Sequence, residues 1–200
     1  IALAKTYLTR GTEGDYQKAI SLADTVLANA SSNLLTKEQL KSYFAGTTSA
    51  ETKNQPETVF EMNMSLNANP GVNESISSYF DPEGSKNYLM FRQDFVQTLA
   101  ATDVRKELFT QENASSNDEP MGHFLLKFRQ KIDGNNFTGN VRIIRLTEVK
   151  FIKWEAMAKS GQGAAALAEL NAFSAERGGK SYTGDALTAI LAEKRIEFIG

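Results

Sequence analysis

The sequence predicts a mostly α-helical protein in which helical hairpins alternate with long irregular loops and a little β-structure. Three observations predict this class. Residues 146–178 hold two helical patterns joined by a glycine-containing break, and residues 1–29 repeat that arrangement. Residues 65–87, between them, are rich in Asn, Ser, Gly and Pro, which is typical of a long loop. Because a short turn makes two neighbouring helices antiparallel, both patterned regions are expected to form hairpins.

The hairpin at 146–178 begins with a helix whose apolar residues cover two faces. They form two strips, Leu146, Val149, Ile152 and Ala156 in one and Phe151, Trp154 and Ala158 in the other. A helix that is apolar on two sides is packed on two sides, so we interpret Trp154 as a core residue. Glu148, Glu155 and Lys159 are left on the third face.

The hairpin at 1–29 pairs residues 1–10 with residues 15–29, and Asp15 stands where a helix favours an N-cap or an early acid. Ala19 here and Ala166 in the later hairpin are small residues at positions where helices approach closely. Both hairpins resemble tetratricopeptide (TPR) units. The sequence therefore predicts TPR-like pairs at 1–30 and within 144–200, separated by a loop-rich insertion at 31–143.

The insertion carries several local signals. They predict a short helix at 36–44 with a Thr36/Gln39 capping box, a strand at 57–64 with Phe60, Met62 and Met64 on an apolar face, a helix at 88–109, and a turn at Asp133-Gly134. A last helix is expected at 184–199. The chain begins at Ile1 inside a helix and ends at Gly200 inside or just after one, so we expect a partial chain.

Composition excludes some classes of function. The 200 residues are 41% hydrophobic and 23% charged, as in an average globular chain, and the net charge of −2 includes no basic stripe for nucleic acid. The sequence has no cysteine, which rules out a disulfide framework, a thiol nucleophile and a Cys-based zinc site. It also has no apolar run near the roughly 20 residues that span a bilayer. No cofactor is expected.

A catalytic or metal site is hard to assemble from these residues. His123 is the only histidine, and its neighbours match no nucleophile or metal motif, so we interpret it as structural. Glu193 and Glu197 flank Arg195 at a spacing typical of an ion network on a helix surface. Residues 133–136 faintly resemble a calcium loop, but the further oxygen ligands and the terminal Glu at EF-hand spacing are missing, so we favour a hairpin turn. We therefore predict neither catalytic nor metal-binding residues.

A binding loop is better supported. Sugar rings offer apolar faces and a rim of hydroxyls, so their sites combine aromatic platforms with amides, hydroxyls and charges. Segment 65–88 has this mixture, and its candidate ligand-binding residues are Asn67, Asn69, Asn73, Tyr79, Phe80, Asp81, Asn87 and Tyr88. The alternative is that the three aromatic residues only fix the loop to the core.

The order of several short phrases resembles the SusD/RagB family of Bacteroidetes outer-membrane nutrient-binding lipoproteins. The phrases are Glu57-Thr58-Val59-Phe60-Glu61, Asp103-Val104-Arg105, Lys127-Phe128-Arg129, Arg145-Leu146-Thr147-Glu148-Val149, Glu155-Ala156, Glu169-Leu170-Asn171 and Glu193-Lys194-Arg195-Ile196-Glu197. The chain departs from the family where arginine commonly follows that Asn, because Ser174 and Glu176 come before Arg177. The resemblance covers nearly all 200 residues.

The resemblance implies one partial SusD-like domain of the α/α superhelix type. It implies a non-catalytic protein that binds an oligosaccharide at the cell surface and delivers it to a SusC-like, TonB-dependent transporter in the outer membrane. Attachment to that membrane would be through a lipid anchor outside this segment. The alternative is a TPR-type module that binds a protein or peptide, as in RagB-like peptide uptake.

Overall fold

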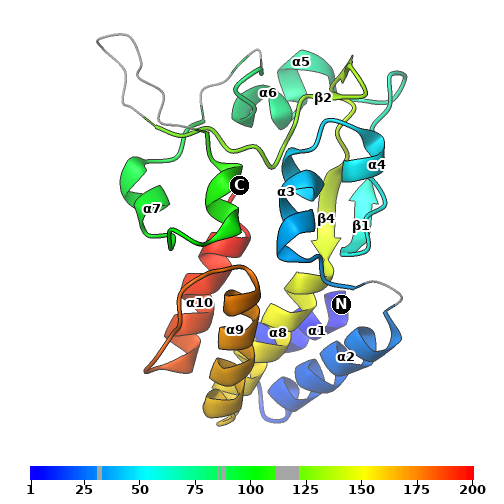
Figure 1. Cartoon of the computed structure of the whole chain (residues 1–200). Helices are drawn as coiled ribbons and strands as arrows, with labels where there is room; N and C mark the ends of the chain where they lie inside the picture. Colours follow the sequence, from blue (N-terminus) through cyan, green and yellow to red (C-terminus); the bar gives the residue numbers. More distant parts are fainter. Residues whose placement is uncertain (31–32, 85, 87–88, 111–121) are drawn as a thin grey trace. The chain divides into compact units, whose positions relative to one another are not determined.

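A computed structural model of the chain describes residues 1–30, 33–84, 86, 89–110 and 122–200 (Figure 1). The chain divides into two compact units. The first, here called the helical unit, holds residues 1–34, 56–59 and 144–199. The second, the loop-rich unit, holds residues 35–55, 60–143 and 200. Each unit therefore combines segments that are distant in the sequence.

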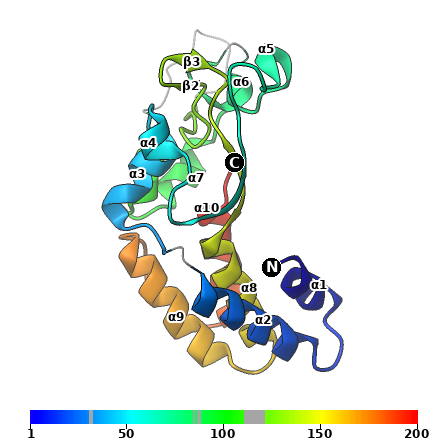
Figure 2. The ribbon, with the colours of Figure 1, turned by 90° about the vertical axis from the view of Figure 1, so that its right-hand side faces the viewer.

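The helical unit is built around α8, which contacts every other long helix of the unit. The helices are α1 (Ala2–Arg10), α2 (Asp15–Asn29), α8 (Leu146–Lys159), α9 (Gly163–Glu176) and α10 (Ala186–Glu197). Helix α1 packs on α2, and α8 packs on α9 and α10 (Figures 1 and 2). Each helix lies within a few residues of its predicted position, which confirms the mostly helical class and both hairpins.

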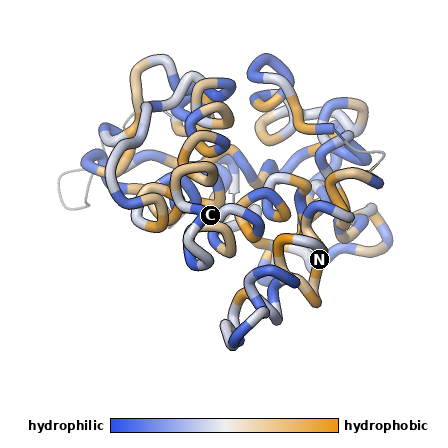
Figure 3. The backbone as a smooth tube through the Cα atoms, turned by 90° about the horizontal axis from the view of Figure 1, so that it is seen from below, coloured by the Kyte–Doolittle hydropathy of each residue, from blue (hydrophilic) through white to orange (hydrophobic). Residues whose placement is uncertain are grey.

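The core of the helical unit surrounds the two apolar strips of α8. Trp154 is 1% exposed, and its ring centroid lies 5.0 Å from that of Phe151 and 5.6 Å from that of Phe173. The indole Nε1 donates a hydrogen bond of 2.8 Å to Glu169, so its polar atom is satisfied. The interpretation of Trp154 as a core residue is confirmed. Hydrophobic and hydrophilic stretches alternate along the tube in Figure 3, as expected of helices that bury only part of their surface.

Asp15 begins α2 and is buried, as an early acid of that helix. Its carboxylate accepts two hydrogen bonds from the Arg10 guanidinium, at 2.7 and 2.6 Å, and one from the Thr12 hydroxyl at 2.6 Å. These bonds favour the ionised form and hold the pKa of Asp15 well below its usual range. The turn between α1 and α2 is thereby fixed at both ends.

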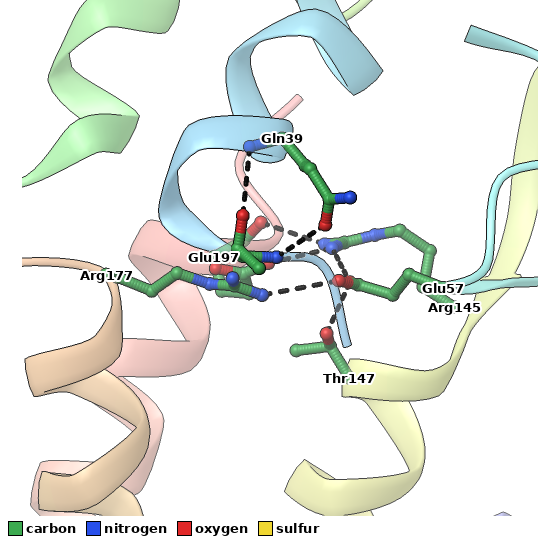
Figure 4. A network of polar contacts seen from close by, with 7 residues as sticks. Gln39, Glu57, Arg145, Thr147, Arg177 and Glu197 are labelled. Carbon is green, nitrogen blue, oxygen red and sulfur yellow. Dashed lines mark hydrogen bonds and ion pairs between the residues drawn. The ribbon is translucent and has the colours of Figure 1, made fainter. Parts of the chain in front are cut away.

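A network of buried charges lies where β4 (Val141–Arg145) ends and α8 begins (Figure 4). The Arg145 guanidinium lies 2.8 Å from a carboxylate oxygen of Glu57 and 2.8 Å from one of Glu197. Arg177 contacts the second oxygen of Glu57 at 3.3 Å, and the Thr147 hydroxyl donates to Glu57. Each carboxylate is thus paired within a dry region, which is what makes burial of the charges tolerable.

The expected surface ion network on the last helix is wrong. Glu193 and Glu197 are 0% and 1% exposed. Glu193 accepts a 2.6 Å hydrogen bond from the Tyr182 hydroxyl, and Glu197 pairs with Arg145 as described. Spacing along one helix could not reveal this, because both partners come from other segments. Glu155, on the third face of α8, is also buried and pairs with Lys194 of α10.

The loop-rich unit contains mostly short elements. They are α3 (Lys37–Ala45), α4 (Ser49–Thr52), α5 (Gly71–Glu74), α6 (Ser77–Phe80), α7 (Gln93–Gln97), the 3₁₀ helix η1 (Val104–Leu108), β2 (Lys131–Ile132) and β3 (Asn135–Asn136). Strand β1 (Thr58–Met62) pairs with β4 in a two-stranded sheet, and the division between the units falls within both strands. The predicted capping box of Thr36 and Gln39 is confirmed at the start of α3.

The helix predicted at 88–109 is wrong over its described part, from Leu89 onward. Here the chain forms α7 and η1, with an irregular segment between them. Phe91 instead exchanges two backbone hydrogen bonds of 2.8 Å with His123, and Asp103 accepts from the Arg105 backbone N–H at the start of η1. A β-bridge and a new cap thus override the helical periodicity. The loop predicted at 65–87 likewise contains the short helices α5 and α6.

Two local interpretations in the loop-rich unit are confirmed. Strands β2 and β3 form a hairpin whose turn residues, Asp133 and Gly134, have φ angles of 51° and 75°, as a two-residue hairpin turn requires. The His123 ring lies between the Thr110 carbonyl, 2.7 Å from Nδ1, and the Gln93 side chain, 3.1 Å from Nε2. Both ring nitrogens therefore serve the local structure.

No helix among the described residues has both the length and the apolar character needed to cross a bilayer.

Candidate ligand-binding pocket

A pocket of about 580 Å³ lies in the loop-rich unit. This volume falls within the roughly 300–1,000 Å³ of small-molecule sites. Its walls come from α3 and α4, from the end of β1 and the segment that follows it, and from residues 127–142. The pocket therefore begins where the predicted binding loop begins, directly after the strand.

The pocket wall is mainly apolar. Its apolar side chains are Phe44, Met62, Met64, Pro70, Ile76, Phe128, Ile132, Phe137 and Val141. Met62 is 49% exposed although it ends a strand with an apolar face. Phenyl rings and methionine side chains offer flat and adaptable apolar surface, so this wall can hold an apolar group of a ligand.

Two amide side chains of the wall are engaged within the protein. Asn140 accepts a hydrogen bond of 3.0 Å from the Met64 backbone N–H and donates one of 2.8 Å to Glu61. Asn69 donates at 2.7 Å to the Ser65 carbonyl and accepts from the Gly71 backbone N–H. These amides fix the course of the chain around the pocket.

The cationic side chains of the wall are engaged as well. The Arg142 guanidinium lies 4.1 Å from the ring centroid of Tyr43 and donates a 3.0 Å hydrogen bond to the Thr52 carbonyl. Arg129 contacts the carboxylates of Asp81 at 3.2 Å and Glu83 at 3.3 Å. The Lys127 ammonium lies 5.1 Å from the ring centroid of Phe44. The charges therefore support the wall through ion pairs and cation–π contacts.

The predicted site residues differ in their surroundings. Asn69 lines the pocket, Asn67 and Asn73 are exposed on the same loop, and Tyr79 is half-buried. The Tyr79 hydroxyl donates a 3.0 Å hydrogen bond to the Asn73 carbonyl, and the Lys86 ammonium lies 5.4 Å from the Tyr79 ring centroid. These contacts hold α6 against the loop. Asn87 and Tyr88 lie outside the described residues.

Phe80 and Asp81 do not line the pocket but contact residues that do. The Phe80 ring centroid lies 5.3 Å from that of Phe128, which lines the pocket. Asp81 is 0% exposed and accepts hydrogen bonds from the Arg129 guanidinium and the Gln130 backbone N–H. The two residues therefore position the segment that forms one wall.

Sequence reasoning did not find most of the pocket residues. Phe44 comes from α3, whereas Phe128, Phe137 and Arg142 are spread over residues 127–142, and no local pattern indicates that they share a wall. The one available signal was the apolar face of the strand, because Met62 and Met64 on that face both line the pocket. A second hollow, in the helical unit, is lined partly by charges that pair with one another, such as Lys153 with Asp24 at 3.1 Å.

Together, these observations define a scaffold of helical hairpins and a loop-rich unit that contains a pocket. Several solved structures match the chain over nearly its whole length. A SusD superfamily protein from Bacteroides thetaiotaomicron has a TM-score of 0.78 and 25% identity, over 99% of this chain and 46% of that chain. A SusD superfamily protein from Bacteroides vulgatus has a TM-score of 0.78 and 24% identity, over 99% and 44%. Surface glycan-binding protein A from Bacteroides thetaiotaomicron has a TM-score of 0.72 and 17% identity, over 98% and 50%.

These matches confirm the resemblance predicted from the sequence, since the chain has the SusD fold over nearly its whole length. The chain spans half or less of the length of each of these proteins. No family model matches the sequence, and no curated protein matches it either.

Proposed function

We propose that this chain is part of a non-catalytic glycan-binding protein, and that the ligand binds at the loop after β1 and the adjoining pocket. The observation that carries the proposal is the pocket itself, which has aromatic residues in its wall and is lined in part by the loop that carries the exposed amides of Asn67 and Asn73. Aromatic surface next to amides suits the apolar faces and hydroxyl rim of a sugar. The name of one structural neighbour, a surface glycan-binding protein, adds independent support.

Within this proposal, the predicted loop residues have different roles. Asn67, Asn69, Asn73 and Tyr79 would contact the ligand, as would Asn87 and Tyr88. Phe80 and Asp81 would act indirectly, because they hold the segment at 128–130 that forms one wall. No step of this function needs a metal, a cofactor or a catalytic residue.

The wider setting rests on the SusD resemblance. We propose that residues 1–200 form part of one SusD-like domain, with TPR-like pairs at 1–30 and 144–200 around the insertion at 31–143. The whole protein would be held at the cell surface by a lipid anchor and would deliver its oligosaccharide to a SusC-like, TonB-dependent transporter. A co-purification of the full-length protein with that transporter tests this setting.

Titration calorimetry with gluco-, xylo-, manno- and galacto-oligosaccharides tests the binding function directly. The wild-type chain is expected to bind at least one of these series, and Tyr79→Ala or Tyr88→Ala is expected to weaken that binding. Tyr79→Phe is the matched control, because it keeps the aromatic face and removes only the hydroxyl that bonds to Asn73. Binding that survives both alanine variants would refute the assigned site. Binding of peptides alone would favour the peptide-uptake alternative.

A further inference from the structure

We infer that the pocket of the loop-rich unit takes an apolar substituent of a saccharide, an aryl or acyl group, rather than an unsubstituted sugar ring. This inference rests on the proposed glycan-binding function and names the ligand class of the same site. It follows from two observations: most polar side chains of the pocket wall already bond within the protein, and the rest of the wall is mainly apolar.

Most polar side chains of the wall have partners inside the protein; the exceptions are the exposed Asn63 and Glu74 and the buried Arg129 Nε, which has no hydrogen-bond partner. Besides Asn69, Asn140, Arg129 and Arg142, the Thr52 hydroxyl donates to the Thr48 carbonyl at 2.8 Å. The hydroxyls of Ser75 and Ser77 lie 2.7 Å from each other. A ligand hydroxyl would have to compete with these bonds. Since a buried hydroxyl without a partner is costly, the interior favours a group with few hydroxyls.

The remaining surface of the wall suits an apolar group. Phe44, Phe128 and Phe137 provide aromatic rings, and Met62 and Met64 provide adaptable side chains that pack well on rings. A ligand group that is removed from water at such a surface increases the binding affinity roughly in proportion to its apolar area. An aryl or acyl substituent fits this chemistry.

The rim of the pocket suits the sugar that would carry the substituent. Asn63 and Glu74 line the pocket and are exposed, so their amide and carboxylate face solvent at its edge. Ala68, Asn69 and Pro70 belong both to the pocket and to the loop proposed to bind glycan. A saccharide held on the loop would therefore direct its substituent into the pocket.

Calorimetric titration of the full chain with methyl and phenyl glycosides of glucose, xylose, mannose and galactose tests this inference. The phenyl glycoside of the preferred sugar is expected to bind at least about tenfold more tightly than the methyl glycoside. Unsubstituted oligosaccharides of the same sugars are titrated in parallel, so that the glycan-binding function is measured separately.

Two variants link the preference to the pocket. Ala68 is exposed at the pocket, and its backbone alone makes the bridge to Ser65, so Ala68→Trp is expected to block the pocket without unfolding the unit. Ala50→Trp, on an exposed position of α4 outside the pocket wall, is the matched control. Met62→Gln adds a polar group to the wall, and Met62→Leu is its apolar control. Ala68→Trp should abolish the phenyl preference and Met62→Gln should reduce it, whereas both controls should keep it.

The outcomes separate the inference from the function on which it rests. Equal binding of phenyl and methyl glycosides, together with binding of oligosaccharides, would overturn the inference and leave the glycan-binding function standing. A phenyl preference that Ala68→Trp does not change would also overturn it. Binding of a phenylalanine-containing tripeptide but of no saccharide, or no binding of any probe, would overturn both.

Discussion

The two units of this chain use their polar side chains in opposite surroundings. In the helical unit, the buried carboxylates of Glu57 and Glu197 pair with Arg145, and Glu57 also pairs with Arg177. In the loop-rich unit, Asn140 and Arg142 bond to the protein at the wall of a pocket about 580 Å³ in volume. The first arrangement fixes helices against one another, and the second keeps a cavity open. This difference is the basis for our proposal that the helical unit serves as scaffold and the loop-rich unit as ligand site.

The largest expected effect on stability comes from a substitution that breaks the buried charge network. Arg145→Ala leaves the carboxylates of Glu57 and Glu197 without their shared cation, so the free energy of unfolding should fall by about 3–5 kcal/mol. Urea unfolding followed by the fluorescence of Trp154, the only tryptophan, reports on the helical unit. Lys5→Ala, which removes an exposed partner of Glu148, is the control and should cost less than about 1 kcal/mol. Equal losses of unfolding free energy in both variants would show that the buried network stabilises the unit no more than an exposed ion pair does.

The next largest effect is the loss of stability when a packed side chain is removed, which we compare between the two units. Leu170 is fully buried in the helical core, so Leu170→Ala should cost about 2–5 kcal/mol by leaving a cavity. Met62, half-exposed at the pocket, loses little packing, so Met62→Ala should cost less than about 1 kcal/mol. Urea unfolding followed by far-ultraviolet circular dichroism measures both variants. A cost at Met62 as large as that at Leu170 would contradict the assignment of Met62 to an open wall.

A smaller effect concerns the capping box of α3. Thr36 accepts from the Gln39 backbone N–H, and the Gln39 side chain accepts from the Thr36 backbone N–H. Thr36→Ala removes the first of these bonds and should destabilise the loop-rich unit by about 1 kcal/mol. Hydrogen exchange of the α3 amides should rise accordingly, and Thr36→Ser should restore the wild-type protection. Unchanged exchange in Thr36→Ala would show that the cap does not limit opening of α3.

The smallest effect at neutral pH concerns the cap of α10. Asp185 accepts a 2.8 Å hydrogen bond from the Thr188 backbone N–H, and this bond lowers the pKa of Asp185. A lowered folded-state pKa gives stability that is present above the unfolded pKa of about 3.9 and is lost as pH falls below it. Asn is an equally good cap, so Asp185→Asn should match the wild type at pH 7 and lose less stability between pH 4 and 2. Parallel pH profiles for the two proteins would contradict this role.

The features predictable from the sequence were those set by neighbours in the chain. The helical period of Leu146, Val149 and Ile152 predicted α8, and the pair Asp133-Gly134 predicted the β2–β3 turn, because each signal spans only a few residues. The burial of Glu197 was not predictable, since its partner Arg145 lies 52 residues away. The pocket was missed for the same physical reason, as its wall brings residue 44 together with residues 128 and 142.

The division of roles between the units is tested most directly by one pair of dissociation constants. Tyr79→Ala, in the loop-rich unit, and Tyr7→Ala, on the partly exposed face of α1, remove the same side chain from the two units. Both variants are titrated with the oligosaccharide that the wild-type chain binds most tightly. We predict that Tyr79→Ala raises the dissociation constant by about tenfold or more and that Tyr7→Ala leaves it unchanged. An equal loss in both variants, or a loss in Tyr7→Ala alone, would contradict the assignment of the ligand site to the loop-rich unit.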